Sequence, residues 1–150
     1  HRPCRRVAGR LFRGRRRAAR DRAKREEALG QLEEATLHYL EAEAPEEAAR
    51  LFALRADAAL DMEKRHLLLG QAVELARGEQ ANQLEARRSE LTLELYRSGA
   101  LRLTRVELES VARRLERAGL PARAAEVYAL LGDAEGQARV LVEAGAIETL

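Results

Sequence analysis

The residues best suited to catalysis or metal binding in this chain are its three histidines, His1, His38 and His66. Glu34 precedes His38 by four residues and Glu63 precedes His66 by three, so each pair would share one face of a helix. A di-iron bundle uses such a pair twice, with two further glutamates on facing helices. Neither pair has these companions, so we interpret the histidines as surface or groove residues and expect no metal or other cofactor.

Nucleophilic and phosphate-binding motifs are missing from the sequence as well. Cys4 is the single cysteine, and no histidine or second cysteine is placed to complete a catalytic set. One cysteine also excludes an internal disulfide and a multi-cysteine zinc site. There is no GxSxG motif, and Gly14 among its arginines lacks the strand that a phosphate loop requires. The sequence therefore predicts a protein that is not an enzyme.

The composition indicates which elements the chain forms. Of its 150 residues, 46% are hydrophobic and 35% are charged, while aromatic residues make up only 3%. Alanine, leucine, glutamate and arginine dominate, and these residues favour helices over strands. The length suits one domain with a buried core. We therefore expect an all-α fold.

The charge divides the chain into two parts. Residues 1–25 contain 12 basic side chains and one acidic side chain, which gives a charge of +11. Residues 26–150 contain 15 basic and 24 acidic side chains, which gives −9. The sequence thus predicts a basic N-terminal arm over 1–25 and a helical domain over 26–150. Such asymmetry points to an anionic partner for the arm, or to an arm folded onto its own acidic domain.

The arm favours a membrane surface over nucleic acid, because its apolar residues Val7, Leu11 and Phe12 fall roughly on one helical face. Stacking on nucleic acid bases would need aromatic residues between the arginines, and only Phe12 is present. The alternative is a solvated arm that is partly disordered when isolated. The residues expected to bind an anionic surface are Arg13, Arg15, Arg16, Arg17 and Arg20.

A 13-residue period marks the end of the chain. Gly119, Gly132 and Gly145 follow this step, and two other series keep it: Ala112, Ala125 and Ala138, then Leu115, Tyr128 and Leu141. A small residue, a large residue and a glycine in fixed order predict one short helix per repeat, which the glycine ends in a left-handed turn.

Helical spacing also appears between residues 29 and 64. Leu29, Leu32, Thr36 and Leu40 predict the buried stripe of one helix, and Pro45 suits the first turn of the next. That second helix should extend to about Lys64 and bury Ala48, Leu51, Phe52, Ala56, Ala59 and Leu60.

These spacings resemble tetratricopeptide repeats, in which a unit of two antiparallel helices recurs every 34 residues. The matching residues are Leu32, Ala35, Tyr39, Ala48 and Phe52, then Leu69 and Gly70, then Ala124, Ala125, Tyr128, Gly132, Leu141 and Ala144. The resemblance implies a right-handed stack of antiparallel helix pairs with about seven helices. Its breaks are expected near Pro45, Gly78, Gly99, Gly119, Gly132 and Gly145.

In the resembled family, the first helix of each unit lines a concave groove. Carried over by position, this implies a protein-binding groove formed by Glu33, Leu37, Leu40, Glu41, Leu67, Gln71, Glu74, Leu75, Glu126 and Leu130. Leucines alternate there with carboxylates, which suits an amphipathic helix or extended peptide with basic residues. Alternatively, each leucine simply packs one helix against another.

The chain starts at His1 rather than Met and stops a few residues into a further helical pattern, so we expect a fragment of a longer protein. No run of about 18 apolar residues is present. Two functions are consistent with these features. One is a non-enzymatic scaffold or adaptor, either free in the cytoplasm or on the inner face of a membrane. The other is the regulatory or sensor domain of a larger membrane-anchored protein or enzyme.

Overall fold

The structure is a computed structural model that describes the backbone of residues 3–148 and the side chains of residues 9–145. This part of the chain forms eight helices and no strand. The helices are α1 (Pro3–Ala28), α2 (Leu32–Glu41), α3 (Pro45–Ala58), α4 (Met62–Leu75), α5 (Gly78–Arg97), α6 (Arg105–Arg117), α7 (Pro121–Leu131) and α8 (Ala134–Glu148).

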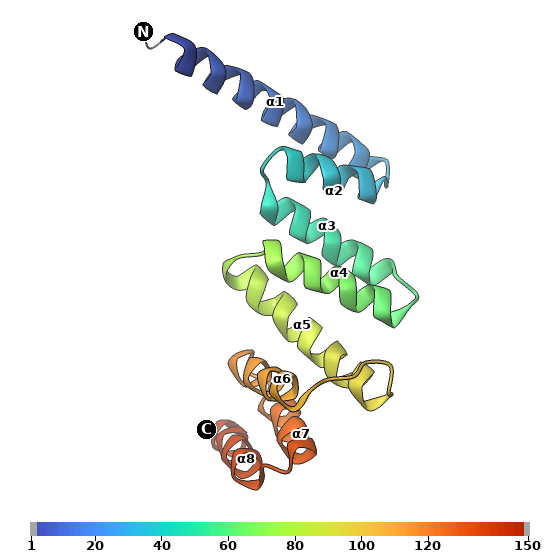
Figure 1. Ribbon diagram of the computed structural model, residues 1–150, viewed down its shortest axis with the longest axis vertical. Coiled ribbons are helices and arrows are strands. Elements are labelled where there is room, and N and C mark those ends of the chain that lie inside the picture. The colour runs from blue at the N-terminus through green and yellow to red at the C-terminus, as the bar shows by residue number, and fades with distance from the viewer. Residues whose placement is uncertain (1–2, 149–150) are drawn as a thin grey trace.

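Each helix packs against the next one along the chain, so the molecule is an elongated stack (Figure 1). This confirms the all-α class and the stacking of successive helices. The count of about seven was low because residues 3–28, predicted as an arm, also form a helix. The contact between α5 and α6 is the least extensive, and the irregular segment 98–104 joins these two helices.

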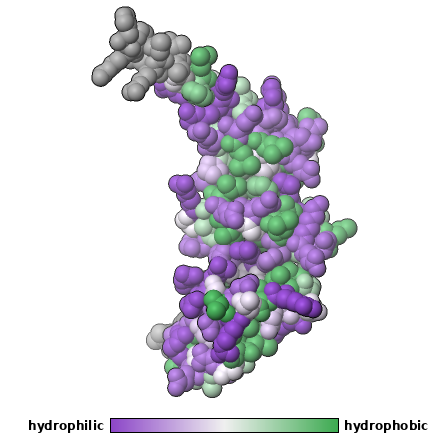
Figure 2. Space-filling model, viewed as in Figure 1, coloured by the Kyte–Doolittle hydropathy of each residue, from purple (hydrophilic) through white to green (hydrophobic). Residues whose placement is uncertain are grey.

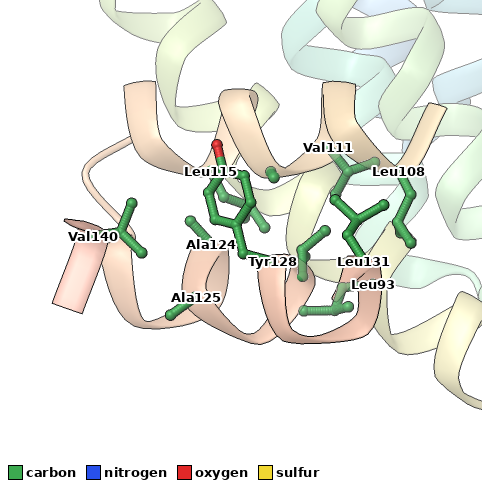
Figure 3. Packing of buried hydrophobic residues seen from close by; sticks show 11 residues of the cluster. Leu93, Leu108, Val111, Leu115, Ala124, Ala125, Tyr128, Leu131 and Val140 are labelled. Carbon is green, nitrogen blue, oxygen red and sulfur yellow. The ribbon is translucent and has the colours of Figure 1, made fainter. Parts of the chain in front are cut away.

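Three apolar clusters follow one another along the stack. The first joins α1, α2 and α3 around Tyr39 and Leu51, and the second joins α3, α4 and α5 around Phe52 and Leu69. The third joins α5 to α8 around Leu115, Tyr128 and Val140 (Figure 3). Tyr128 is buried in this third cluster, as its place in the 13-residue period predicts.

Two of the predicted glycine turns decide where α6 and α7 end. Gly119 and Gly132 have φ values of 76° and 72°, a left-handed conformation that favours glycine. After Gly132, the amide of Asp133 donates to the carbonyl of Tyr128 at 2.9 Å and closes the end of the helix. The predicted break at Gly145 is wrong, because α8 continues through it to Glu148. The residues that follow Gly145 can extend a helix and supply no cap.

The predicted end of the second helix near Lys64 is also wrong. Helix α3 ends at Ala58, and the side chain of Asp61 accepts a hydrogen bond from the amide of Glu63 at 3.1 Å, so Asp61 caps the start of α4. Leu60 therefore lies in the connecting turn and is 96% exposed rather than buried. Leu29 is exposed for the same reason, because it lies in the turn between α1 and α2.

Helix α1 is continuous across residue 25, the predicted limit of the arm. Ala19 and Ala23, in its C-terminal half, are buried in the first cluster against α2. The N-terminal half stands clear of the stack (Figure 1).

Candidate protein-binding surface

Helices α2 and α4 leave several leucines uncovered. Helix α2 buries Ala35, Thr36 and Tyr39, which turns Leu37 outward with 66% of its surface exposed. Helix α4 buries Leu68, Leu69 and Ala72, which leaves Leu67 64% exposed. Leu40 is also exposed, so its prediction as part of the buried stripe of this helix is wrong. Exposed apolar side chains that form one patch mark an interaction surface, whereas single exposed leucines are common.

Both helices pack against α3, and both line one hollow. Glu33 from α2 lines one hollow of about 380 Å³ together with Lys64 and Leu68 from α4. At the other end, Leu75 of α4 packs against the cluster that contains Tyr39. We call the outward side of this pair the α2–α4 face; its residues are Glu33, Leu37, Leu40, Glu41, Leu67, Gln71 and Glu74. Figure 2 shows apolar patches among hydrophilic side chains along one side of the stack.

The carboxylates of the α2–α4 face are largely unpaired. Among the described side chains, Glu41 and Glu74 have no ion pair. Glu33 is 73% exposed and reaches Arg55 only at 4.0 Å. Two cations, Arg55 and Lys64, lie at the Glu33 end of the face. The rest of the face therefore presents leucines beside negative charge.

The structure does not join Glu126 and Leu130 to this face. They line a separate hollow of about 380 Å³ between α7, α8 and the end of α5. Helix α7 is tied to α5 by the ion pairs Arg97–Glu126 at 3.2 Å and Arg123–Glu90 at 3.8 Å. Leu75, another of the ten predicted groove residues, is half-buried and packs against two apolar clusters. Seven of the ten thus lie on the α2–α4 face.

The arginines predicted to bind an anionic surface all lie on α1. Arg16 pairs with Glu43 at 3.0 Å, and the Nε atom of Arg13 donates to the carbonyl of Gly9 at 3.2 Å. Arg15, Arg17 and Arg20 are exposed and have no ion pair within the described part of the chain. Leu11 and Phe12 are exposed too, whereas the side chains of Cys4 and Val7 lie outside the described residues.

His38 and His66 each contact a polar side chain of a neighbouring helix, whereas His1 lies outside the described residues. The hydroxyl of Thr92 donates to the carbonyl of Arg88 at 2.8 Å, so it accepts from Nε2 of His66 at 2.7 Å. Burial lowers the pKa of His66, and the positive charge of Arg88 lowers it further. His38 Nδ1 approaches Glu26 Oε1 to 2.5 Å. Among the described residues, no group of three or more His, Cys, Asp or Glu side chains could hold a metal ion.

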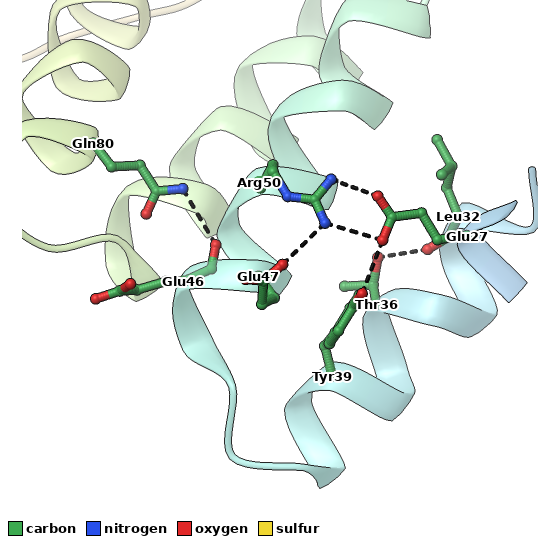
Figure 4. A network of polar contacts seen from close by, with 8 residues as sticks. All are labelled: Glu27, Leu32, Thr36, Tyr39, Glu46, Glu47, Arg50 and Gln80. Atoms are coloured by element: carbon green, nitrogen blue, oxygen red, sulfur yellow. Dashed lines mark hydrogen bonds and ion pairs between the residues drawn. The ribbon is translucent and has the colours of Figure 1, made fainter. Parts of the chain in front are cut away.

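A polar triad that occurs twice went unnoticed in the sequence. Glu27, Tyr39 and Arg50 form the first copy, in which the Tyr39 hydroxyl donates to Glu27 at 2.9 Å and Arg50 donates twice to the same carboxylate, at 2.5 and 2.9 Å (Figure 4). Each member of the second copy follows its counterpart by 89 residues: Glu116, Tyr128 and Arg139. The repeated spacing of 12 and then 11 residues was the signal that could have revealed it.

The second triad joins the same three residue types, but Arg139 donates only once to the carboxylate and its other amino group donates to the Tyr128 hydroxyl at 3.4 Å. Tyr128 donates its hydroxyl proton to Glu116, and Arg139 donates to Glu116 at 2.5 Å. In both copies the arginine lowers the pKa of the glutamate, although partial burial opposes this shift. Burial raises the pKa of each tyrosine. The triads tie three successive helices together, so we interpret them as structural.

Comparisons with models of protein families, with curated proteins and with solved structures find no match for this chain. None of the described helices is both long enough and apolar enough to cross a membrane.

Proposed function

We propose that this chain is a non-enzymatic interaction module, resembling tetratricopeptide repeats, that binds another protein through the α2–α4 face. The observation that carries the proposal is the exposure of Leu37, Leu40 and Leu67 on two helices that line one hollow. Glu41 and Glu74 lie on the same helices and have no ion pair among the described side chains. A surface of this kind suits a basic amphipathic segment, whose apolar side would cover the leucines while its cations meet the carboxylates.

The cations of α1 support a second contact, with an anionic surface. Arg15, Arg17 and Arg20 are free of carboxylates of their own chain in the described region, and each basic residue near an anionic lipid leaflet contributes about 1 kcal/mol. The proposal places the module in the cytoplasm, and on the inner face of a membrane if α1 binds acidic lipid there.

The test uses the full chain and a fluorescent peptide designed as an amphipathic helix of leucine and arginine. We expect the peptide to bind with a Kd near the micromolar range, about −8 kcal/mol. Exchanging Glu33, Glu41 and Glu74 for lysine should weaken binding at least about tenfold, because it replaces attraction by repulsion. Helical content should not change, since these side chains are exposed.

A matched control exchanges Glu79, Glu94 and Glu135 for lysine, three exposed glutamates on α5 and α8. It alters the net charge equally but leaves the α2–α4 face intact. If the control weakens binding as much as the first variant, the peptide follows overall charge and the face is not a binding site.

A further inference from the structure

We infer that the segment that binds the α2–α4 face is the projecting half of α1 from a second copy of this chain. This inference rests on the proposed function, since it uses the same face and names its ligand. Three observations support it: the N-terminal half of α1 projects from the stack, the arm and the rest of the chain have opposite charge, and the C-terminal half of α1 is packed against α2.

The projecting half of α1 has the chemistry that the face requires. The Arg16–Glu43 ion pair marks where α2 ends, so the segment from Pro3 to Arg15 extends beyond it by about 20 Å. Leu11, Gly14 and Ala18 fall on one line of this helix, at i, i+3 and i+7. Arginines flank this line on both sides, at positions 15 and 17. The segment is therefore a basic helix with a narrow apolar stripe.

The stripe around Leu11 is not the side that packs inside the molecule. Helix α1 contacts α2 through Ala19 and Ala23, and Phe12 continues that line at seven residues before Ala19. Leu11 points about 100° away from Phe12 around the helix axis, because successive helical residues are separated by that angle. Docking through Leu11 thus leaves the contact between α1 and α2 undisturbed.

The charges of the two surfaces are complementary. Residues 1–25 carry +11 and the remainder carries −9, so the attraction between copies is strongest from the arm of one to the body of the other. Glu41 and Glu74 lack ion-pair partners among the described side chains, so docked arginines would displace nothing. The attraction acts over a screening length of about 8 Å at physiological salt, and therefore weakens as salt is added.

Helix α1 cannot reach its own α2–α4 face. The helix runs without a break through Arg16, and the burial of Ala19 and Ala23 fixes its direction. Figure 1 shows that this direction carries the N-terminal half away from α2 and α4. The contact must therefore be made between copies, from arm to face. Such a head-to-tail contact can close into a ring or continue into a chain of copies.

The test is the association of the full chain, measured by sedimentation velocity across a range of concentrations. At about 50 mM salt we expect the sedimentation coefficient to rise with concentration, and at about 0.5 M salt we expect the value of a monomer. An arm variant exchanges Arg13, Arg15, Arg17 and Arg20 for glutamate, and the face variant exchanges Glu33, Glu41 and Glu74 for lysine. Each variant alone should remain monomeric, and an equimolar mixture of the two should associate again.

The recovery in the mixture is the decisive result, because two misfolded variants would not restore each other. Arg16 is left unchanged to keep its ion pair with Glu43. The control with Glu79, Glu94 and Glu135 exchanged for lysine should associate as the wild type does. A further variant, Leu11→Ser, should weaken association, since it removes the apolar part of the stripe.

Other outcomes overturn the inference. The inference is wrong if the wild-type chain remains monomeric at every concentration in low salt. It is also wrong if the arm variant no longer associates while the face variant still does. If the monomeric chain still binds the designed peptide through the α2–α4 face, the proposed function stands without this inference. If it binds acidic vesicles or DNA through the arginines instead, the anionic partner of α1 is a membrane or nucleic acid.

Discussion

The molecule contains one three-helix arrangement twice, at its two ends, and the copies differ in what surrounds them. Residues 16–56 correspond to residues 105–145, each position shifted by 89. Both copies have a glutamate, tyrosine and arginine triad, and both have a left-handed glycine after the first helix. The backbone hydrogen bond that follows also repeats, from Gln31 to Glu26 and from Leu120 to Leu115, at 2.9 Å in each.

The outward positions of the two copies are not alike. Arg22 in α1 corresponds to the buried Val111 in α6, where α5 covers the helix. Arg22 is exposed, because no helix in the described part of the chain covers this side of α1. At the other end, Phe52 of α3 is 8% exposed beneath α4, whereas its counterpart Leu141 in α8 is 47% exposed. The triad thus defines the unit, and the neighbouring helix determines the residues around it.

The largest expected effect in a test of this correspondence comes from replacing the tyrosine of each triad. Tyr39→Ala and Tyr128→Ala should each lower the free energy of unfolding by about 3–4 kcal/mol, because each removes a large side chain from a helix interface. Urea denaturation followed by circular dichroism measures both. If one variant loses less than about 1 kcal/mol, the two copies are not energetically equivalent.

A second test exchanges an ion pair of the first copy for the apolar contact of the second. Glu26 and His38 occupy the positions of Leu115 and Val127, which are fully buried. Neither Glu26 Oε1 nor His38 Nδ1 has a well-aligned hydrogen bond, although the two atoms are only 2.5 Å apart. Because apolar replacements of such buried pairs are often stabilising, the double variant Glu26→Leu with His38→Val should gain about 1–3 kcal/mol in thermal denaturation.

The single variant Glu26→Leu is the control for this exchange. It removes the carboxylate but leaves a half-buried imidazole next to leucine, so we expect a loss rather than a gain in unfolding free energy. A double variant that is less stable than the wild type would show that the first copy depends on its ion pair.

How much of the fold the sequence predicts depends on what ends each helix. The turns at Gly119 and Gly132 were predictable because a left-handed residue follows a periodic apolar stripe. The turn before α4 was missed because its signal is Asp61, a cap residue that falls within the second helix as predicted to Lys64. The break at Gly145 was wrongly predicted because glycine permits a helix end without requiring one.

The candidate site was predictable only in part, for a different reason. Spacing on one helix predicts that Leu37 points outward, because its neighbours Thr36 and Tyr39 lie on the buried side of that helix. Spacing cannot tell which helices lie side by side, because that depends on contacts such as Arg97–Glu126 between α5 and α7. This is why Glu126 and Leu130 were assigned to the same groove as the residues of α2 and α4.

A third test uses acid. The pKa of Glu27 and that of Glu116 are lowered by their arginines, so both copies bind fewer protons when folded than when unfolded. Their contribution to stability is full above the ordinary glutamate pKa of about 4.3 and is lost as the pH falls through the lowered folded value. Glu27→Gln and Glu116→Gln should each cost about 1–2 kcal/mol near pH 7 and much less in acid. Urea denaturation at several pH values measures this, and a cost that is independent of pH contradicts it.

The smallest test concerns a left-handed position that is glutamate in the first copy and glycine in the second. Glu43 has a φ of 55° at the position where Gly132 has 72°, and its amide donates to Leu40 at 3.0 Å as that of Gly132 does to Ala129 at 3.1 Å. A side chain in this conformation costs about 1 kcal/mol, whereas glycine adopts it freely. Glu43→Gly should therefore stabilise the chain by up to about 1 kcal/mol, and Gly132→Ala should destabilise it by a similar amount. Glu43→Ala separates the backbone from the ion pair with Arg16, because it removes the pair but keeps the strained conformation. If Glu43→Ala is as stable as Glu43→Gly in thermal denaturation, the benefit comes from the side chain, and the left-handed turn of the first copy carries no strain.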